Sequence, residues 1–153
     1  MSSVLAASLP AAPGSYLLVL EVVQARRIRV GALGQLALQP GFYVYAGSAF
    51  GPGGLAARLA HHLRRARRPR WHIDYLRRHA IPREIWFLQG AQREHAWARA
   101  LAARPSATLP CARFGASDCR CAAHLVRFAR RPGPGWLRPR LGGGPLARYR
   151  IAG

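Results

Sequence analysis

Lysine is absent from this sequence of 153 residues, and only five side chains carry a carboxylate. Without lysine, both a Schiff base with a substrate and a lysine that binds phosphate are excluded. A site for two metal ions usually needs several carboxylates that converge on it. We therefore expect any metal-dependent chemistry to use one ion or none. The five carboxylates belong to Glu21, Asp74, Glu84, Glu94 and Asp118.

Cysteine is scarce as well, and long apolar runs are missing. The three cysteines all lie in the last third of the chain, and an odd number is not typical of a disulfide-stabilised secreted domain. No apolar run approaches the ~20 residues that span a bilayer. Residues 1–13 lack the basic start and the apolar centre of a signal peptide. We expect a cytoplasmic protein with reduced cysteines and no membrane segment.

Arginine, by contrast, is abundant. All 24 basic residues are arginines, and the formal net charge is +19. A folded domain with this charge repels itself, so an anionic partner would stabilise it. Nucleic acid is the first expectation and an anionic membrane surface the second. An alternative stays open, because 28 alanines and arginine without lysine are also typical of a GC-rich genome.

Length and apolar content predict one folded domain. Half of the residues are apolar, which excludes a disordered basic tail, and a chain of this length buries about 70% of its unfolded surface. Apolar periodicity and turn residues predict strands at 16–23, 27–30, 35–38, 42–46 and 85–88, and helices at 55–68, 71–79 and 94–104. Residues 119–131 fit either a helix or a strand.

These elements predict an α/β (α+β) fold in which a small central antiparallel sheet is flanked by helices. Residues 14–47 hold most of the expected strands, so we expect them to form that sheet. The domain is expected to span residues 14–130. Residues 1–13 are rich in alanine, serine and proline, and glycine and proline recur from residue 132 onwards. Residues 1–13 and 132–153 are therefore expected to be loose termini.

The first expected helix follows a glycine-rich loop and carries side chains suited to phosphate. Arg58 and His62 are four residues apart and are therefore neighbours on one face. A guanidinium beside an imidazole, next to such a loop, suits a phosphate group. A solvated basic face is the open alternative, most of all for the arginines that follow. The arginines expected to contact a nucleic acid are Arg65, Arg68 and Arg70.

Two short motifs place tyrosines at the ends of two expected strands. Gly14-Ser15-Tyr16 opens the first strand, and Tyr45-Ala46-Gly47 closes the aromatic strand. These motifs resemble those of the GIY-YIG nuclease family, and a closer similarity is to its DUF123 branch. The resemblance covers roughly residues 14–128 and implies a GIY-YIG-like fold. Its further matching stretches are 42–49, 51–55, 71–76 (Trp-His-Ile-Asp-Tyr-Leu) and 117–121 (Ser-Asp-Cys-Arg-Cys).

The resemblance implies a role for each matching residue. Tyr16 and Tyr45 match the two motif tyrosines, one of which acts on the attacking water. Arg58 matches the arginine that stabilises the pentavalent phosphate. Glu94 matches the glutamate that binds the metal ion, which is Mg²⁺ or Mn²⁺. The further implied active-site residues are His62 and His72.

The sequence departs from the family pattern in two ways. Ser15 stands where isoleucine is usual in the first motif, and Ala46 stands where isoleucine or valine is usual in the second. The spacing from Tyr16 to Tyr45 is longer than usual, which implies an inserted hairpin around residues 27–39.

Other interpretations of the same residues stay open. Both motif tyrosines fit a core position with a bonded hydroxyl, and Tyr43 could take the role of Tyr45. Glu94 is favoured near a helix start in any case. His72 and Asp74 could simply bond neighbouring backbone, and the aromatic residues beside them fit a packing role.

The last third of the chain contains a possible zinc site. Cys119, Cys121 and His124 offer ligands that zinc prefers, although their spacing differs from the usual Cys-x-x-Cys. Reduced cysteines that pack as small apolar residues are the alternative.

Taken together, these residues predict a metal-dependent endonuclease that hydrolyses phosphodiesters of DNA, in preference to RNA, with one divalent ion and a tyrosine-assisted water. A non-catalytic nucleic-acid-binding module on the same fold is the main alternative, and a basic adaptor for an anionic protein is a third. We expect no separate recognition domain, so specificity is expected to come from the shape of this domain or from a protein partner.

Overall fold

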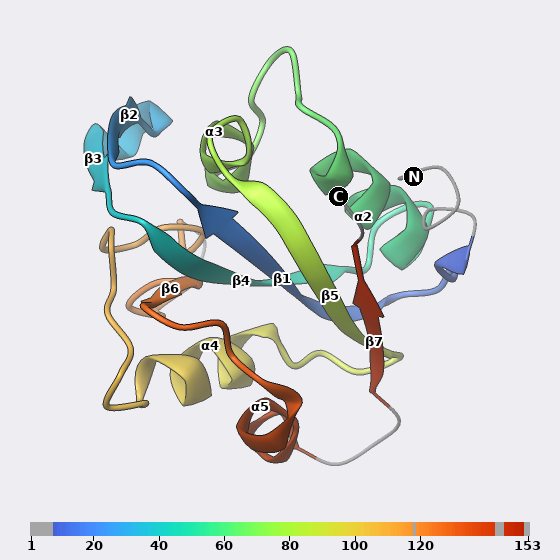
Figure 1. Cartoon of the computed structure of the whole chain (residues 1–153). Coiled ribbons are helices and arrows are strands. Elements are labelled where there is room, and N and C mark those ends of the chain that lie inside the picture. The colour runs from blue at the N-terminus through green and yellow to red at the C-terminus, as the bar shows by residue number, and fades with distance from the viewer. Residues whose placement is uncertain (1–7, 118, 143–145, 152–153) are drawn as a thin grey trace.

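A five-stranded antiparallel sheet forms the centre of the computed structural model, which describes residues 8–117, 119–142 and 146–151. The strand order is β6-β4-β1-β5-β7 (Figure 1). The expected mixed fold with a central antiparallel sheet is confirmed. The strands are β1 (Gly14–Val22), β4 (Gly41–Ala49), β5 (Ile81–Gln89), β6 (Leu125–Phe128) and β7 (Ala147–Arg150).

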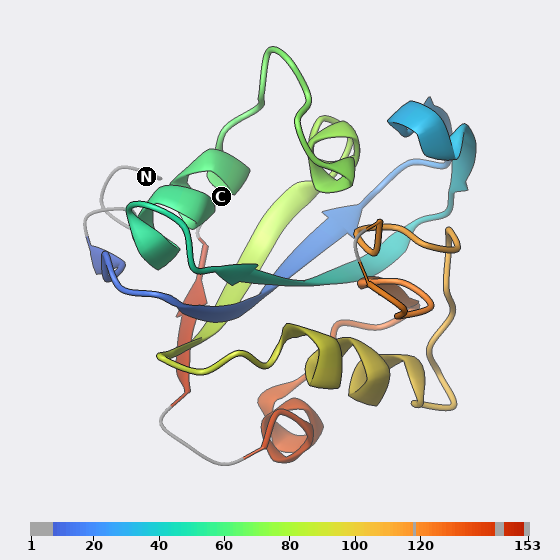
Figure 2. The ribbon, with the colours of Figure 1, turned by 180° about the vertical axis from the view of Figure 1, so that it is seen from behind.

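Helices cover both faces of this sheet (Figures 1 and 2). Helices α2 (Gly54–Leu63) and α3 (His72–Arg77) lie on one face, and α4 (Glu94–Ala102) and α5 (Pro134–Arg140) lie on the other. Side chains of a strand alternate between faces. In β1, Leu18 packs on the α2 side, whereas Leu17 and Val19 pack on the α4 side. This two-sided burial explains the unbroken apolar run predicted as a buried strand.

A hairpin separates β1 from β4. Strands β2 (Arg26–Arg29) and β3 (Gln35–Leu38), joined by the short helix η1 (Gly31–Leu33), form their own two-stranded sheet. A hairpin at the expected place is therefore confirmed, but the expectation of one sheet over residues 14–47 is wrong for this part. The short strands alternate, with Ile28 buried between exposed arginines, so they bury one face only.

Helix α2 ends five residues earlier than predicted, at Leu63. The next residues are mostly arginines, whose like charges destabilise a further turn, and Pro69 disfavours a helical residue before it. The guanidinium of Arg77 bonds the carbonyls of His62 and Leu63 at distances of 2.9 and 3.0 Å. These bonds satisfy carbonyls at the helix end. None of the helices in the described part of the chain combines the length and apolar character that crossing a membrane requires.

The C-terminal part of the chain is more ordered than the sequence predicts. The ambiguous segment forms β6, and the expectation of a loose terminus over residues 132–153 is wrong for α5 and β7. Leu137 of α5 is fully buried, and the indole N–H of Trp97 donates to the carbonyl of Leu141 at 2.7 Å. Buried leucines and a capping bond therefore help to hold a segment rich in glycine and proline.

The N-terminal end is also partly packed. Residues 1–7 lie outside the described residues, but Leu9 is buried, and the carbonyl of Ala12 accepts a bond from the amide of Leu55 at 2.9 Å. The expectation of a loose terminus is therefore wrong for residues 8–13. This segment binds the first turn of α2, and it brings the start of β1 against that helix.

Candidate functional site

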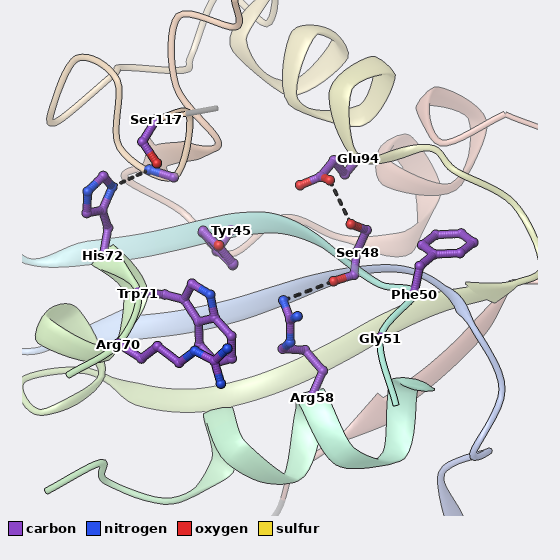
Figure 3. A pocket seen from close by; sticks show the side chains of 11 residues that line it. Tyr45, Ser48, Phe50, Gly51, Arg58, Arg70, Trp71, His72, Glu94 and Ser117 are labelled. Atoms are coloured by element: carbon purple, nitrogen blue, oxygen red, sulfur yellow. Dashed lines mark hydrogen bonds between the residues drawn. The ribbon is translucent and has the colours of Figure 1, made fainter. Parts of the chain in front are cut away.

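A cavity of about 400 Å³ opens where the end of β4, the starts of α3 and α4, and helix α2 approach one another (Figure 3). The structure brings four residues of the sequence prediction together in its lining, namely Tyr45, Arg58, His72 and Glu94, together with the predicted nucleic-acid residue Arg70. The other lining residues are Ser48, Phe50, Gly51, Trp71, Gly115 and Ser117.

The two motif tyrosines lie side by side, as their motifs predict. Tyr16 of β1 pairs with Gly47 of β4, and the ring centroids of Tyr16 and Tyr45 are 6.4 Å apart. A Cβ atom at residue 47 would lie 2.4 Å from Cζ and from the hydroxyl of Tyr16. Glycine is therefore required there, because its missing side chain makes room for the Tyr16 ring.

Tyr16 and His62 form a buried pair behind the cavity. The Tyr16 hydroxyl lies 2.6 Å from Nε2 of His62, and neither residue lines the cavity. Burial, opposed by Asp74, lowers the pKa of His62 from 6.5 to about 3. Burial and the neighbouring Tyr45 raise the pKa of Tyr16 well above 10. Near neutral pH the pair is therefore an uncharged phenol and an uncharged imidazole.

Two guanidinium groups in the cavity lining both lie over the ring of one tryptophan. Cζ of Arg58 lies 4.2 Å from the ring centroid of Trp71, and Cζ of Arg70 lies 4.8 Å from it. Arg58 also donates to the carbonyl of Ser48 at 3.1 Å. Cation–π contacts fix such side chains without neutralising them. The cavity wall therefore carries two oriented positive charges.

Glu94 supplies the carboxylate of the cavity and begins α4, where the helix dipole favours a negative charge. Its Oε1 accepts a bond from the Ser48 hydroxyl at 2.7 Å, and its Oε2 lies 3.1 Å from Nδ1 of His124. Burial alone would raise the pKa of Glu94, but hydrogen bonds from His124 and Ser48 hold it below its usual value. The group is ionised at neutral pH.

Ser15 fixes the loop that leads into Glu94. Its hydroxyl donates to the carbonyl of Ala91 and accepts a bond from the amide of Arg93, both at 2.7 Å. Ser15 is fully buried at the start of β1. Ser15 therefore ties the first tyrosine motif to the start of α4.

A hydrogen bond from the backbone determines which ring nitrogen of His72 carries the proton. Its Nδ1 accepts a bond from the amide of Gly115 at 2.8 Å, and burial lowers its pKa. A neutral ring that accepts at Nδ1 carries its proton on Nε2. His72 can therefore donate a hydrogen bond from Nε2. The alternative interpretation, that these residues bond neighbouring backbone, holds in part for Asp74, which accepts from the amides of Arg70 and Trp71 and also contacts His61. The backbone partner of His72 is distant in the sequence.

Some of the predicted residues do not reach the cavity. Arg65 lies on a different surface hollow, beside Arg78, and Arg68 is exposed on the loop after α2. The hydroxyl of Tyr43 bonds the backbone of Gln39 in the turn before β4, so Tyr43 does not take the place of Tyr45.

Sequence reasoning missed Ser48, Phe50 and Ser117. For Ser48 a signal exists, because a polar residue stands in an otherwise apolar strand directly after the second motif.

The three residues of the possible zinc site lie close together, and a fourth joins them. The ligand atoms of His95, Cys119, Cys121 and His124 all lie within 4.8 Å of one another. Sequence reasoning missed His95 because it stands on α4, far along the chain from the cysteines. Asp118 lies outside the described residues.

Comparison with known proteins gives one match. The model of the family described as domain of unknown function DUF123 matches residues 15–135, which is most of the chain. No curated protein and no solved structure matches. The matched range includes both motif tyrosines, the whole lining of the cavity and the cysteine segment. The chain therefore belongs to the DUF123 family.

Proposed function

We propose that this protein is a metal-dependent endonuclease related to the GIY-YIG nucleases, which hydrolyses phosphodiester bonds of DNA in preference to RNA. One observation carries the proposal. Ser48 bonds Arg58 through its carbonyl and Glu94 through its hydroxyl, so one residue holds a guanidinium and a carboxylate on opposite sides of the same cavity. Figure 3 shows this arrangement, with Tyr45 between the Ser48 side and the His72 side.

Four of the lining side chains have a direct task in this reaction. A water adds to phosphorus, one P–O ester bond breaks, and the oxygen that leaves takes a proton. Arg58 and Arg70 bind the phosphate oxygens and stabilise the charge that develops on them. Tyr45 orients the water and accepts its proton. A free phenol has a pKa of about 10, so positive charge nearby is needed for it to act as a base. His72 donates from Nε2 to the leaving oxygen or to the phosphate.

Glu94 is suited to hold Mg²⁺ or Mn²⁺. It is ionised. Its Oε1 has Ser48 and, at 3.4 Å, Gln92 as partners, and its Oε2 has His124, so Oε2 keeps lone pairs for a cation. Mg²⁺ needs only one or two carboxylates when waters and substrate phosphates complete its shell. The ion, when bound, supplies positive charge to the phosphate. Within the described residues Glu94 is the carboxylate of this cavity, which fits one ion and not two.

Tyr16 and His62 support the site from behind in this proposal. Their mutual bond keeps the His62 ring against Tyr45, with ring centroids 6.0 Å apart. The pair therefore fixes the tyrosine that borders the cavity and does not itself exchange protons with substrate. This assigns the reacting phenol to Tyr45.

A non-catalytic nucleic-acid-binding module is the second candidate. It is favoured by the arginines between α2 and α3, which are exposed and of which Arg70 lines the cavity, and by the single carboxylate, whose oxygens both have protein partners. Both readings predict affinity for polyanions that falls steeply with salt. Only the first predicts cleavage.

The test compares cleavage and binding in two pairs of matched variants. Tyr45→Phe is expected to lose most cleavage with binding unchanged, whereas Tyr43→Phe removes a hydroxyl from the same strand away from the cavity and should keep its rate. Arg58→Ala is expected to reduce cleavage by ~10²–10³-fold, and Arg29→Ala removes an equal charge from an exposed position on β2.

Structured DNA and RNA substrates with Mg²⁺, and salt titrations of binding, supply the readouts. Equal cleavage by Tyr45→Phe and Tyr43→Phe would contradict the role of Tyr45. Binding without cleavage by the wild-type chain across the whole panel would support the module instead.

A further inference from the structure

We propose that His95, Cys119, Cys121 and His124 bind one zinc ion. The Sγ atom of Cys119 lies 3.4 Å from Nε2 of His124, and the Sγ atom of Cys121 lies 3.4 Å from Nδ1 of His95. A tetrahedral zinc ion with Zn–S bonds of ~2.3 Å and Zn–N bonds of ~2.0 Å separates its ligand atoms by about 3.3 to 3.8 Å. All four ligand atoms lie within 4.8 Å of one another. A small contraction therefore completes the coordination shell.

The second nitrogen of His124 lies near the kind of group that a zinc-bound histidine bonds. Such a ligand usually donates its other ring N–H to a carboxylate or a carbonyl, which fixes the ring. Nε2 of His124 faces Cys119, and its Nδ1 lies 3.1 Å from Oε2 of Glu94. The ring is almost fully buried, and the backbone of His124 bonds both Phe114 and Ala46. This arrangement links the zinc site to the carboxylate of the cavity.

The backbone of the cysteine segment is held in position before any ion binds. The guanidinium of Arg113 donates to the carbonyls of both Cys119 and Cys121. Residues 119–124 form no helix or strand, so few other contacts keep them on the start of α4. A zinc ion would join this segment to His95 and would therefore fix the beginning of the helix that carries Glu94.

The ligand set favours zinc over the ion proposed for the cavity. Thiolates and imidazoles select zinc among the common divalent ions, whereas Mg²⁺ prefers oxygen ligands. Four protein ligands leave no open position, which is typical of a structural site. Two thiolates and two neutral imidazoles also balance the charge of the ion. The zinc therefore acts on structure, and it positions Glu94 through His124.

Metal content of the full-length chain tests the site directly. The protein is loaded with zinc, desalted and analysed by plasma mass spectrometry. Wild type is expected to retain about one equivalent, and His95→Ala and Cys121→Ser are expected to retain almost none. Cys111→Ser is the matched control, because Cys111 is a free cysteine outside the cluster. It should retain zinc like wild type.

Two further measurements on the wild-type chain keep the test valid if a variant fails to fold. Zinc should protect Cys119 and Cys121, so a thiol reagent should react with one cysteine in the loaded protein and with all three after chelation. Removing zinc present at about 100 times its Kd should lower the melting temperature by about 5 to 11 °C.

No retained zinc, three reactive thiols in the loaded protein, or equal zinc loss in Cys111→Ser and Cys121→Ser would each overturn the proposal. None of these readouts requires nuclease activity, so the zinc proposal and the proposed function can fail separately.

Discussion

The buried histidine behind the cavity makes the stability of the fold depend on pH. Burial lowers the pKa of His62 from 6.5 to about 3, Asp74 opposes this shift, and His61, Arg58 and Arg77 add to it. Below pH 6.5 the unfolded chain binds a proton at His62, whereas the folded chain stays neutral until about pH 3. The contribution of neutral His62 to the stability of the fold is therefore fully present above pH 6.5 and is lost as the pH falls from 6.5 to about 3. At pH 5 the loss from His62 alone is about 2 kcal/mol.

His62→Gln removes this titration and keeps a polar group that can bond the Tyr16 hydroxyl. Urea unfolding at pH 7.5 and pH 5.0 measures the difference. Between pH 7.5 and pH 5.0, the free energy of unfolding should fall by about 2 kcal/mol more in wild type than in His62→Gln. For a slope of ~2 kcal/mol/M, this is a difference of ~1 M in the shift of the urea midpoint. The other titrating groups are the same in both chains, so their contributions to this difference cancel. His79→Gln, at a partly exposed histidine whose pKa is also lowered, should change the pH dependence less. Equal losses in wild type and His62→Gln would refute the reasoning.

Two further substitutions test how the site is supported, each by thermal or urea unfolding. Gly47→Ala forces a Cβ atom to within 2.4 Å of the Tyr16 ring, and overpacking of this kind costs about 1–3 kcal/mol. Gly51→Ala meets no atom within 4 Å and should be nearly neutral, so equal effects would contradict the packing argument. Glu84→Ala leaves two arginines without the fully buried carboxylate that they bond at 2.6 Å. The free energy of unfolding should fall by about 2–3 kcal/mol, less than for a fully buried pair because the arginines are partly exposed. Glu21→Ala removes a more exposed ion pair and should cost less than ~1 kcal/mol; a larger effect there would contradict this ranking.

The sequence predicts the centre of the fold well because its patterns are local. The apolar run of β1 and the aromatic run of β4 identify two central strands, and the two motifs bring Tyr16 and Tyr45 together. How deeply a side chain is buried is harder to predict, because burial depends on how the helices and strands pack against one another. Tyr16 and Tyr45 have the same chemistry, yet only Tyr45 lines the cavity.

The parts that the sequence misses depend on single long-range contacts. The sequence does not predict α5 because glycine and proline are not typical of a helix. Leu137 and a bond to Trp97 hold this helix in place. Strand β7 gains its place through Arg148 and the buried Glu84. His95 joins the cysteines only because α4 packs beside β4 and β6, and no sequence spacing indicates that approach.

The proposed endonuclease activity depends most directly on Glu94. Wild type and Glu94→Gln are compared for cleavage of structured DNA and RNA with Mg²⁺ and with a chelator, and Glu21→Gln serves as a control with the same loss of charge outside the cavity. The proposal predicts cleavage by wild type and Glu21→Gln that the chelator abolishes, and little or none by Glu94→Gln, with binding kept in all three. Equal cleavage by Glu94→Gln and wild type, or cleavage unaffected by the chelator, would contradict it.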